Sequence, residues 1–162
     1  MLTSVGDYVN LLGLFYSYFG ALEIFIDEHI SPGYLPDIHE RRKTDLISRD
    51  LLCLGTGVPQ KLTPDFIPDI QNRYQAFGAL YVIEGSSLGG IHIAKMIHKK
   101  LPEVSNAFLF FEGYGEQTIT MWKRFKSGLD NLSGDRDELH AVISGAQNTF
   151  LKFAEWIHLN IK

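Results

Sequence analysis

Apolar side chains recur every three or four positions along the N-terminal part of the chain, which is the spacing of one helical face. They are Tyr8, Leu11, Leu12, Phe15, Phe19, Leu22 and Ile26. Asp7 is a candidate N-cap, and Ser31-Pro32-Gly33 is a stop signal. The pattern therefore predicts one long amphipathic helix that begins near Asp7 and ends before Ser31.

Similar patterns predict helices along the rest of the chain. They span about residues 37–54, 73–101, 117–132 and 135–159, with a short helix starting at Thr63-Pro64-Asp65 and an apolar-aromatic segment at 107–111. Gly55-Thr56-Gly57 ends the first of these helices, and Ser133-Gly134 separates the last two. The charged residues near the start of the helix at 37–54 are interpreted as a solvated face. No segment has a sustained period of two, so we expect an all-α fold, with one core and a single domain over residues 1–162.

The helix predicted at 73–101 carries its weakest helix formers at its centre, in the stretch Gly85-Ser86-Ser87-Leu88-Gly89-Gly90. Each interior glycine costs roughly 0.5–1 kcal/mol relative to alanine, so the helix forfeits about 2–3 kcal/mol there. The helical period places Tyr81, Gly85, Gly89 and His92 on one narrow stripe. The rest of the helix is apolar nearly all round, and we expect it to be buried.

Two interpretations of this glycine stripe remain open. Small residues four apart let another helix approach closely, and adjacent glycines allow a kink without a proline. Alternatively, the bare face lies against a flat, bulky ligand, and Ser86 or Ser87 offers a hydroxyl beside it. The spacing of the glycines does not distinguish the two.

Composition and charge narrow the class of protein. The chain has 162 residues with 15 Lys and Arg against 19 Asp and Glu, and a net charge of −4 argues against a nucleic-acid partner bound through phosphates. The single cysteine, Cys53, lies among leucines and is interpreted as a small buried hydrophobe; the absence of an internal disulfide suits a cytoplasmic location. The uncharged run at 8–22 is interrupted by polar residues and glycines, so we expect neither a signal peptide nor a membrane span.

The stretch at 85–90 resembles the distal-helix pattern Gly-Ser-Ser/Thr-Leu-Gly-Gly of the haem oxygenase family, particularly its bacterial branch found alongside bacterial phytochromes. Other segments resemble further helices of that family in the same order, at about residues 2–23, 41–55, 114–129 and 141–156. The resemblance implies an all-α haem oxygenase fold. It also implies the family reaction, in which haem, oxygen and electrons give biliverdin, carbon monoxide and iron.

The resemblance also implies roles for single residues. Gly85 and Gly89 would let the helix backbone lie over the porphyrin, which steers oxygen toward a meso carbon, and the same haem-binding surface would include Gly90 and Tyr81. Ser86 stands where animal relatives have a carboxylate that organises distal water. A hydroxyl can hold water without carrying charge, and its alternative role is a hydrogen bond to a carbonyl one turn back.

Two further residues are candidates for the site. Lys123 aligns with the basic residue that pairs a haem propionate, and its alternative role is an exposed lysine on an amphipathic helix. His92 lies on the Gly85/Gly89 stripe and can face the ligand from the distal side, or serve as a hydrogen-bonded core histidine.

The family's axial histidine lies on a helix that precedes the segment beginning here at Leu2-Thr3, so we expect no metal ligand in this chain. The one Glu-x-x-His motif, Glu155 to His158, falls short of the paired motifs that a di-iron site needs. Without the first helix, apolar surface would be exposed, which predicts self-association. An alternative function is a non-catalytic module that binds haem or a bilin, or another protein. No flavin or nicotinamide loop is visible, so an enzyme would need an external ferredoxin or reductase.

Overall fold

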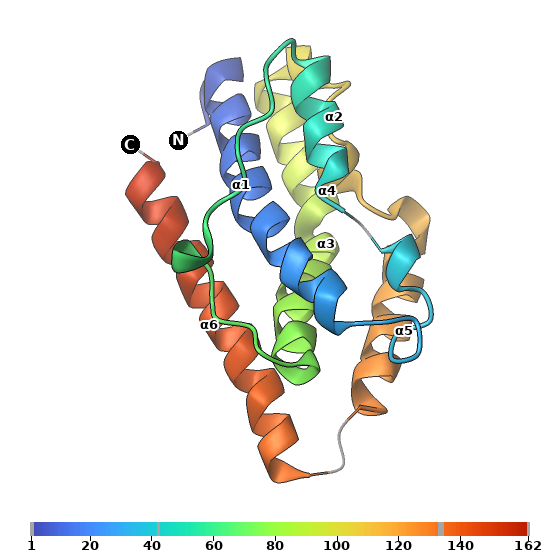
Figure 1. The fold of residues 1–162 in the computed structure, drawn as a ribbon. Helices are drawn as coiled ribbons and strands as arrows, with labels where there is room; N and C mark the ends of the chain where they lie inside the picture. The colour runs from blue at the N-terminus through green and yellow to red at the C-terminus, as the bar shows by residue number, and fades with distance from the viewer. Residues whose placement is uncertain (1, 42, 133–134, 162) are drawn as a thin grey trace.

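The computed structural model describes residues 2–41, 43–132 and 135–161, and every regular element in these ranges is helical, as predicted. The longer helices are α1 (Val5–His29), α3 (Arg73–Lys100) and α6 (Arg136–Asn160), and the shorter ones are α2 (Asp45–Cys53), α4 (Leu109–Glu112) and α5 (Thr118–Asp130). Short 3₁₀ helices lie between them: η1 (Ile38–Glu40), η2 (Pro64–Phe66), η3 (Pro102–Val104) and η4 (Gly115–Gln117). Figure 1 shows α1 running in the opposite direction to α3 and α6.

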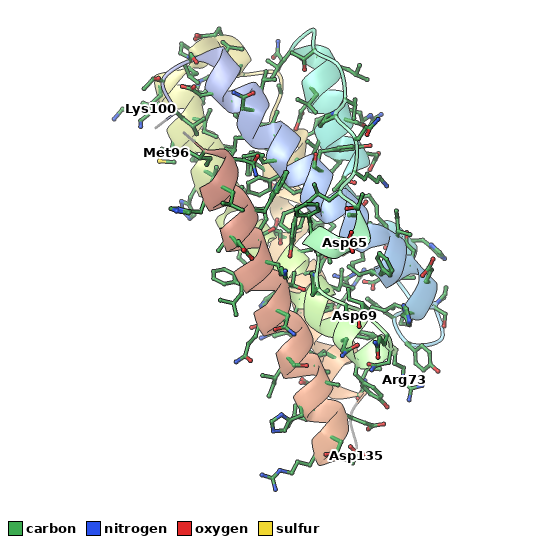
Figure 2. The ribbon with its side chains drawn as sticks, turned by 60° about the vertical axis from the view of Figure 1, so that its left-hand side comes forward. Asp65, Asp69, Arg73, Met96, Lys100 and Asp135 are labelled. Atoms are coloured by element: carbon green, nitrogen blue, oxygen red, sulfur yellow. The ribbon has the colours of Figure 1, made fainter. Side chains whose placement is uncertain are left out.

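The packing of α3 against α6 is the most extensive helix pair contact in the structure. Figure 2 shows that both helices begin at the same end of the molecule, where Arg73 and Asp135 lie, while Met96 and Lys100 mark the far end of α3. The backbones meet at Gly78 and Gly145: a β-carbon at Gly78 would lie 2.6 Å from the Ala146 nitrogen, and one at Gly145 would lie 2.8 Å from the Gln75 α-carbon. Glycine is therefore required on both sides of this crossing.

Two buried tyrosines tie the long helices to other parts of the chain. The Tyr8 hydroxyl donates to the Ala107 carbonyl at 2.6 Å, and the Tyr18 hydroxyl donates to the Thr149 carbonyl at 2.7 Å. Neither tyrosine is exposed to solvent. Burial raises the pKa of both phenols above their ordinary value, and the charges of Asp50 and Glu112 raise the pKa of Tyr8 further.

We therefore expect the free energy of unfolding to fall as the pH rises above 10. In the unfolded chain a tyrosine ionises near pH 10, and folding must then exclude the charged form, at a cost of about 1.4 kcal/mol per pH unit for each buried phenol. Urea denaturation at several alkaline pH values measures this slope. The Tyr18→Phe variant should have a shallower slope than the wild type, and an identical slope would contradict the assignment.

The observed helix starts differ from two predictions. Ser4, not Asp7, is the N-cap of α1: the Asp7 amide donates to the Ser4 hydroxyl oxygen at 3.1 Å, while the Asp7 carboxylate accepts from the Ser4 amide at 3.0 Å. Asp7 is thus the acidic partner of a capping box rather than the cap itself. The predicted helix at 37–54 is observed only in its second half, as α2, because the chain is extended at Arg41, between η1 and α2.

The remaining helices agree closely with the sequence. The structure confirms a helix from Arg73 to Lys100 and another from Arg136, with Asp135 as its N-cap. The helix predicted at 117–132 is observed as α5. The predicted break at Ser133-Gly134 lies outside the described residues, as does Arg42.

Three predictions of burial are wrong. Cys53 is exposed, because it lies at the end of α2, where only one face of the short helix meets the core. α3 is not buried all round: Tyr81, Leu88 and Met96 are exposed. Arg41 does not belong to a solvated face, since its side chain is buried.

The length and composition of α1 bear on the prediction that this part of the chain does not span a membrane. At 25 residues α1 is long and apolar enough to cross a membrane, although its polar residues and glycines led to the prediction of no span. Within this structure 44% of its most apolar window is buried, and α1 packs against α2, α3 and α6. A core helix passes the same test of length and composition, so the test alone is weak evidence for a span.

Candidate functional site

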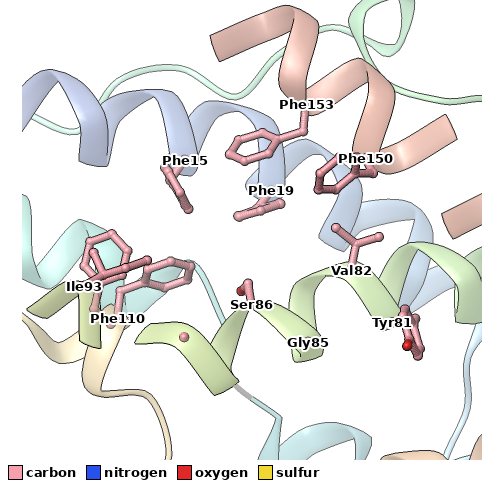
Figure 3. A pocket seen from close by; sticks show the side chains of 12 residues that line it. Phe15, Phe19, Tyr81, Val82, Gly85, Ser86, Ile93, Phe110, Phe150 and Phe153 are labelled. Carbon is pink, nitrogen blue, oxygen red and sulfur yellow. The ribbon is translucent and has the colours of Figure 1, made fainter. Parts of the chain in front are cut away.

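A cavity of about 460 Å³ lies between α1, α3, α4 and α6, within the usual size range of small-molecule sites. We call it the central pocket (Figure 3). Its lining is almost entirely apolar and is formed by Phe15, Phe19, Tyr81, Val82, Gly85, Ser86, Gly89, Ile93, Phe110, Phe111, Phe150 and Phe153. Only Ser86 and Tyr81 bring a side-chain hydroxyl to this lining.

One wall of the central pocket is aromatic. Figure 3 shows Phe15 and Phe19 of α1 beside Phe153 of α6. The Phe153 ring stacks on Phe19 with their centroids 4.8 Å apart and meets the edge of Phe15 at 5.0 Å. The Trp156 indole donates to the Leu14 carbonyl at 3.1 Å, which joins α6 to α1 beside this wall. Contacts between rings and between helices thus hold the wall in place.

The opposite wall is the glycine-rich part of α3, and its glycines have different environments. A β-carbon built on Gly89 would meet no atom within 4 Å, and one on Gly85 would meet only the Trp122 ring, at 3.8 Å. A β-carbon on Gly90 would overlap the Phe111 carbonyl group, because α4 lies directly against α3 there. Close helix packing therefore occurs at Gly90, which lies beside the stripe, whereas the ligand interpretation for Gly85 and Gly89 stays a prediction. Gly90 serves helix packing and does not line the central pocket, in contrast to its predicted place on the ligand surface.

The two serines of this segment hydrogen-bond to their own helix. The Ser86 hydroxyl donates to the Ile83 carbonyl at 2.6 Å, and the Ser87 hydroxyl donates to the Glu84 carbonyl at 2.6 Å. The predicted bond to a carbonyl one turn back is therefore present. Ser86 also lines the central pocket, whereas Ser87 is buried elsewhere. The structure thus places one of the two hydroxyls at the candidate site.

Tyr81 lies at the edge of the pocket, beside Trp122 of α5. Tyr81 is 42% exposed, and its ring lies 5.2 Å from that of Trp122. The Lys126 ammonium lies 5.9 Å from the centre of the Trp122 ring. Lys123 is exposed on α5 and does not line the central pocket, so its pairing with a propionate stays a prediction.

None of the six histidines lines the central pocket, and all six lie in the described part of the chain. The prediction that His92 is a core histidine is wrong: its ring is exposed, because the stripe turns toward solvent beyond Gly89. No group of three or more potential metal ligands occurs within residues 2–41, 43–132 and 135–161.

The sequence analysis missed a buried ionic cluster directly behind the glycine wall. Glu84, next to Gly85, accepts from the Arg41 guanidinium and from the Tyr114 hydroxyl, each at 2.8 Å. Arg41 also pairs with Asp37 at 2.8 Å. Burial opposes the charge on Arg41, but the hydrogen bonds to Asp37 and the charge of Glu84 outweigh it and raise the pKa of Arg41. The sequence feature that could have indicated this cluster is a glutamate in the middle of an otherwise apolar helix.

The phenylalanines that line the central pocket were also not predicted as part of the site. The apolar-aromatic segment at 107–111 was recognised, but nothing in its pattern connects Phe110 and Phe111 to the glycines of α3. Together the two walls form an apolar slot with a bare backbone on one side and rings on the other. Such a slot suits a flat, hydrophobic ligand.

Comparisons with known proteins give two matches. A family profile described as Heme oxygenase matches residues 66–159, which include α3, α4, α5 and all but the last residue of α6. A protein named heme oxygenase from Xanthomonas campestris pv. campestris (strain 8004) is 33% identical to this chain over 113 residues. That alignment covers 70% of this chain and 66% of the relative, so the chain spans just under two thirds of the relative's length. No solved structure matches the chain significantly.

Proposed function

This chain belongs to the haem oxygenase family, and from that membership we propose that it binds haem in the central pocket and converts it to biliverdin, carbon monoxide and iron. The observation that carries the proposal is the pairing of a bare helix wall at Gly85 and Gly89 with a wall of phenylalanines. A porphyrin is flat and hydrophobic, and the missing side chain at Gly89 leaves room for it beside the helix. Haem supplies the iron at which oxygen is activated.

The chain's own residues contribute shape, exclusion of water and one hydroxyl. The aromatic side chains remove the porphyrin faces from water, which accounts for most of the binding free energy of an apolar ligand. Close contact at Gly85 and Gly89 limits where oxygen can lie above the ring. The Ser86 hydroxyl, which already donates to the Ile83 carbonyl, has lone pairs that can hold a water at this wall.

The finer assignments are part of the same proposal. We assign the chain to the bacterial, phytochrome-associated branch, which the glycine-serine pattern at 85–90 and the similarity to the Xanthomonas protein support. None of the six histidines of this sequence lines the central pocket, so the described residues would offer bound haem no histidine ligand there. Electrons come from an external ferredoxin or reductase.

A haemin titration followed by absorption spectroscopy tests this proposal. We expect saturable binding, with a Soret band that sharpens when imidazole is added as an external iron ligand. Gly89→Leu should weaken haemin binding at least about tenfold, because its side chain would fill the slot where a ligand of this size buries most of its surface. The matched control is Lys95→Leu, which adds the same side chain to an exposed position of α3 outside the pocket and should bind haemin as the wild type does.

Addition of a reductant under air then separates binding from turnover. A biliverdin spectrum supports the enzyme. Haemin that is bound but not degraded, with imidazole present, would favour the non-catalytic tetrapyrrole-binding alternative. Equal binding by wild type, Gly89→Leu and Lys95→Leu would mean that the central pocket is not the haem site.

A further inference from the structure

We propose that Glu84 is a positioning residue that holds the glycine wall of α3 in a fixed position relative to the aromatic wall on the other side of the central pocket. Its carboxylate lies on the side of α3 away from the pocket, and its backbone leads directly into Gly85 and Ser86. This inference rests on the proposed function only where it concerns haem; the claim about α3 itself does not depend on it.

The Glu84 carboxylate links α3 to three other parts of the chain, two of them directly and the third, α5, through Arg41. Its Oε2 accepts from Arg41, which follows η1, and its Oε1 accepts from Tyr114, which precedes η4, both at 2.8 Å. The same Arg41 nitrogen donates to the Met121 carbonyl of α5 at 2.8 Å. Arg41 is itself held by Asp37 through two further nitrogen contacts, at 2.8 and 3.1 Å. Glu84 is 1% exposed and Arg41 is 3% exposed, so water does not weaken these contacts.

The segment after Glu84 needs such an anchor because its own helix is weak. Gly85, Gly89 and Gly90 give little helix propensity, and the hydroxyls of Ser86 and Ser87 bond to carbonyls one turn back, an arrangement that tends to bend helices. On the pocket side, Gly89 has open space rather than a packed neighbour. The contacts that hold this segment therefore come from the opposite face: Gly90 against α4 at one end and Glu84 at the other.

A buried ion pair suits this role better than an apolar contact. Apolar side chains of similar volume often give equal or greater stability, but they allow the two packed elements to slide past each other. A guanidinium and a carboxylate form hydrogen bonds in only a few relative orientations. Glu84 has both oxygens engaged, which restricts both the rotation of α3 and its position along its axis.

Hydrogen exchange of the ligand-free protein tests the positioning role directly. Glu84→Gln removes the negative charge, so the ion pair with Arg41 becomes a weaker neutral hydrogen bond while the shape of the side chain is kept. We expect the backbone amides of residues 85–90 to exchange about tenfold faster, while those of α1 change by less than about twofold. Tyr114→Phe, which removes one hydrogen bond and keeps the ion pair, should give a smaller increase at the same amides.

The matched control is Glu23→Gln. Glu23 is a partly buried glutamate of α1 whose carboxylate accepts from the Thr44 amide and hydroxyl, and it has no hydrogen bond to α3. It should leave exchange at residues 85–90 unchanged. A uniform acceleration along α1, α3 and α6 in Glu84→Gln, or no acceleration at all, would overturn the positioning role.

A haemin titration of the same variants extends the test to the ligand. We expect Glu84→Gln to weaken haemin binding and, where the wild type turns haem over, to broaden the mixture of biliverdin isomers, because the wall no longer has one position. Unchanged affinity together with an unchanged isomer ratio would contradict the link to the site. If the wild type itself binds no haemin, the proposed function fails, and the exchange data still decide the role of Glu84.

Discussion

Alanine at Gly90 is expected to lower the free energy of unfolding by about 1–3 kcal/mol, whereas alanine at the adjacent Gly89 is expected to raise it by about 0.5–1 kcal/mol. The two substitutions are chemically identical and lie in the same helix, so intrinsic propensity predicts the same gain at both. The difference arises from what each new methyl group meets.

At Gly90 the new β-carbon would overlap the Phe111 carbonyl oxygen and lie 3.1 Å from the Phe111 carbonyl carbon. Backbone atoms of another helix are difficult to displace, so α4 must move away from α3. That movement also disturbs the bonds from the Leu109 and Phe110 amides to the Asp50 carboxylate, at 2.9 and 3.0 Å, which fix the start of α4. The strain exceeds the gain in helix propensity.

At Gly89 the new β-carbon meets nothing within 4 Å, so the protein keeps the full benefit of alanine in a helix. The methyl group does, however, enter the central pocket. We expect Gly89→Ala to bind haemin more weakly than the wild type although it is more stable, an opposition typical of functional sites.

Urea denaturation of the two alanine variants measures both shifts as changes in the midpoint at constant slope. Equal stability of the two variants would show that α4 does not press on α3 at Gly90. A destabilised Gly89→Ala variant would show that the space beside Gly89 is filled by part of the protein.

Removal of the Arg41 side chain is the second change with a large expected effect. Arg41→Met should lower the free energy of unfolding by about 3–5 kcal/mol, because it leaves the Glu84 carboxylate buried without its cation. The loss includes the bond to the Met121 carbonyl at 2.8 Å and the ion pair with Asp37. The Arg41 guanidinium also lies 5.8 Å from the centre of the Phe125 ring, a favourable cation–π contact that methionine cannot make.

The double variant Arg41→Met, Glu84→Leu separates two contributions to the free energy of unfolding. One is the net contribution of the ion pair, and the other is the cost of leaving Glu84 buried without its cation. The double variant removes the buried carboxylate at Glu84, although Asp37 still loses its cation, so we expect it to recover at least about half of the stability lost in Arg41→Met. Thermal or urea denaturation gives the three values needed for the comparison. A double variant no more stable than Arg41→Met alone would show that the loss does not come from an unpaired carboxylate at Glu84.

Much of the fold follows from sequence pattern alone, because a helix depends mainly on residues close to one another in the chain. The apolar spacing in α1 and the helical pattern at 135–159 predicted elements that the structure contains. The stretch at 85–90 identified the segment that forms one wall of the central pocket. These features are encoded locally, in propensity, capping and periodicity.

Other features depend on contacts between residues far apart in sequence, and no local pattern reports them. Arg41 looks like part of a solvated face, yet Glu84 and the Met121 carbonyl approach it in space and make its burial favourable. Gly89 and Gly90 are neighbours with the same intrinsic properties, and only the position of Phe111 gives them opposite roles. The central pocket itself exists because four helices meet around it, so its phenylalanines became part of one site only when the chain folded.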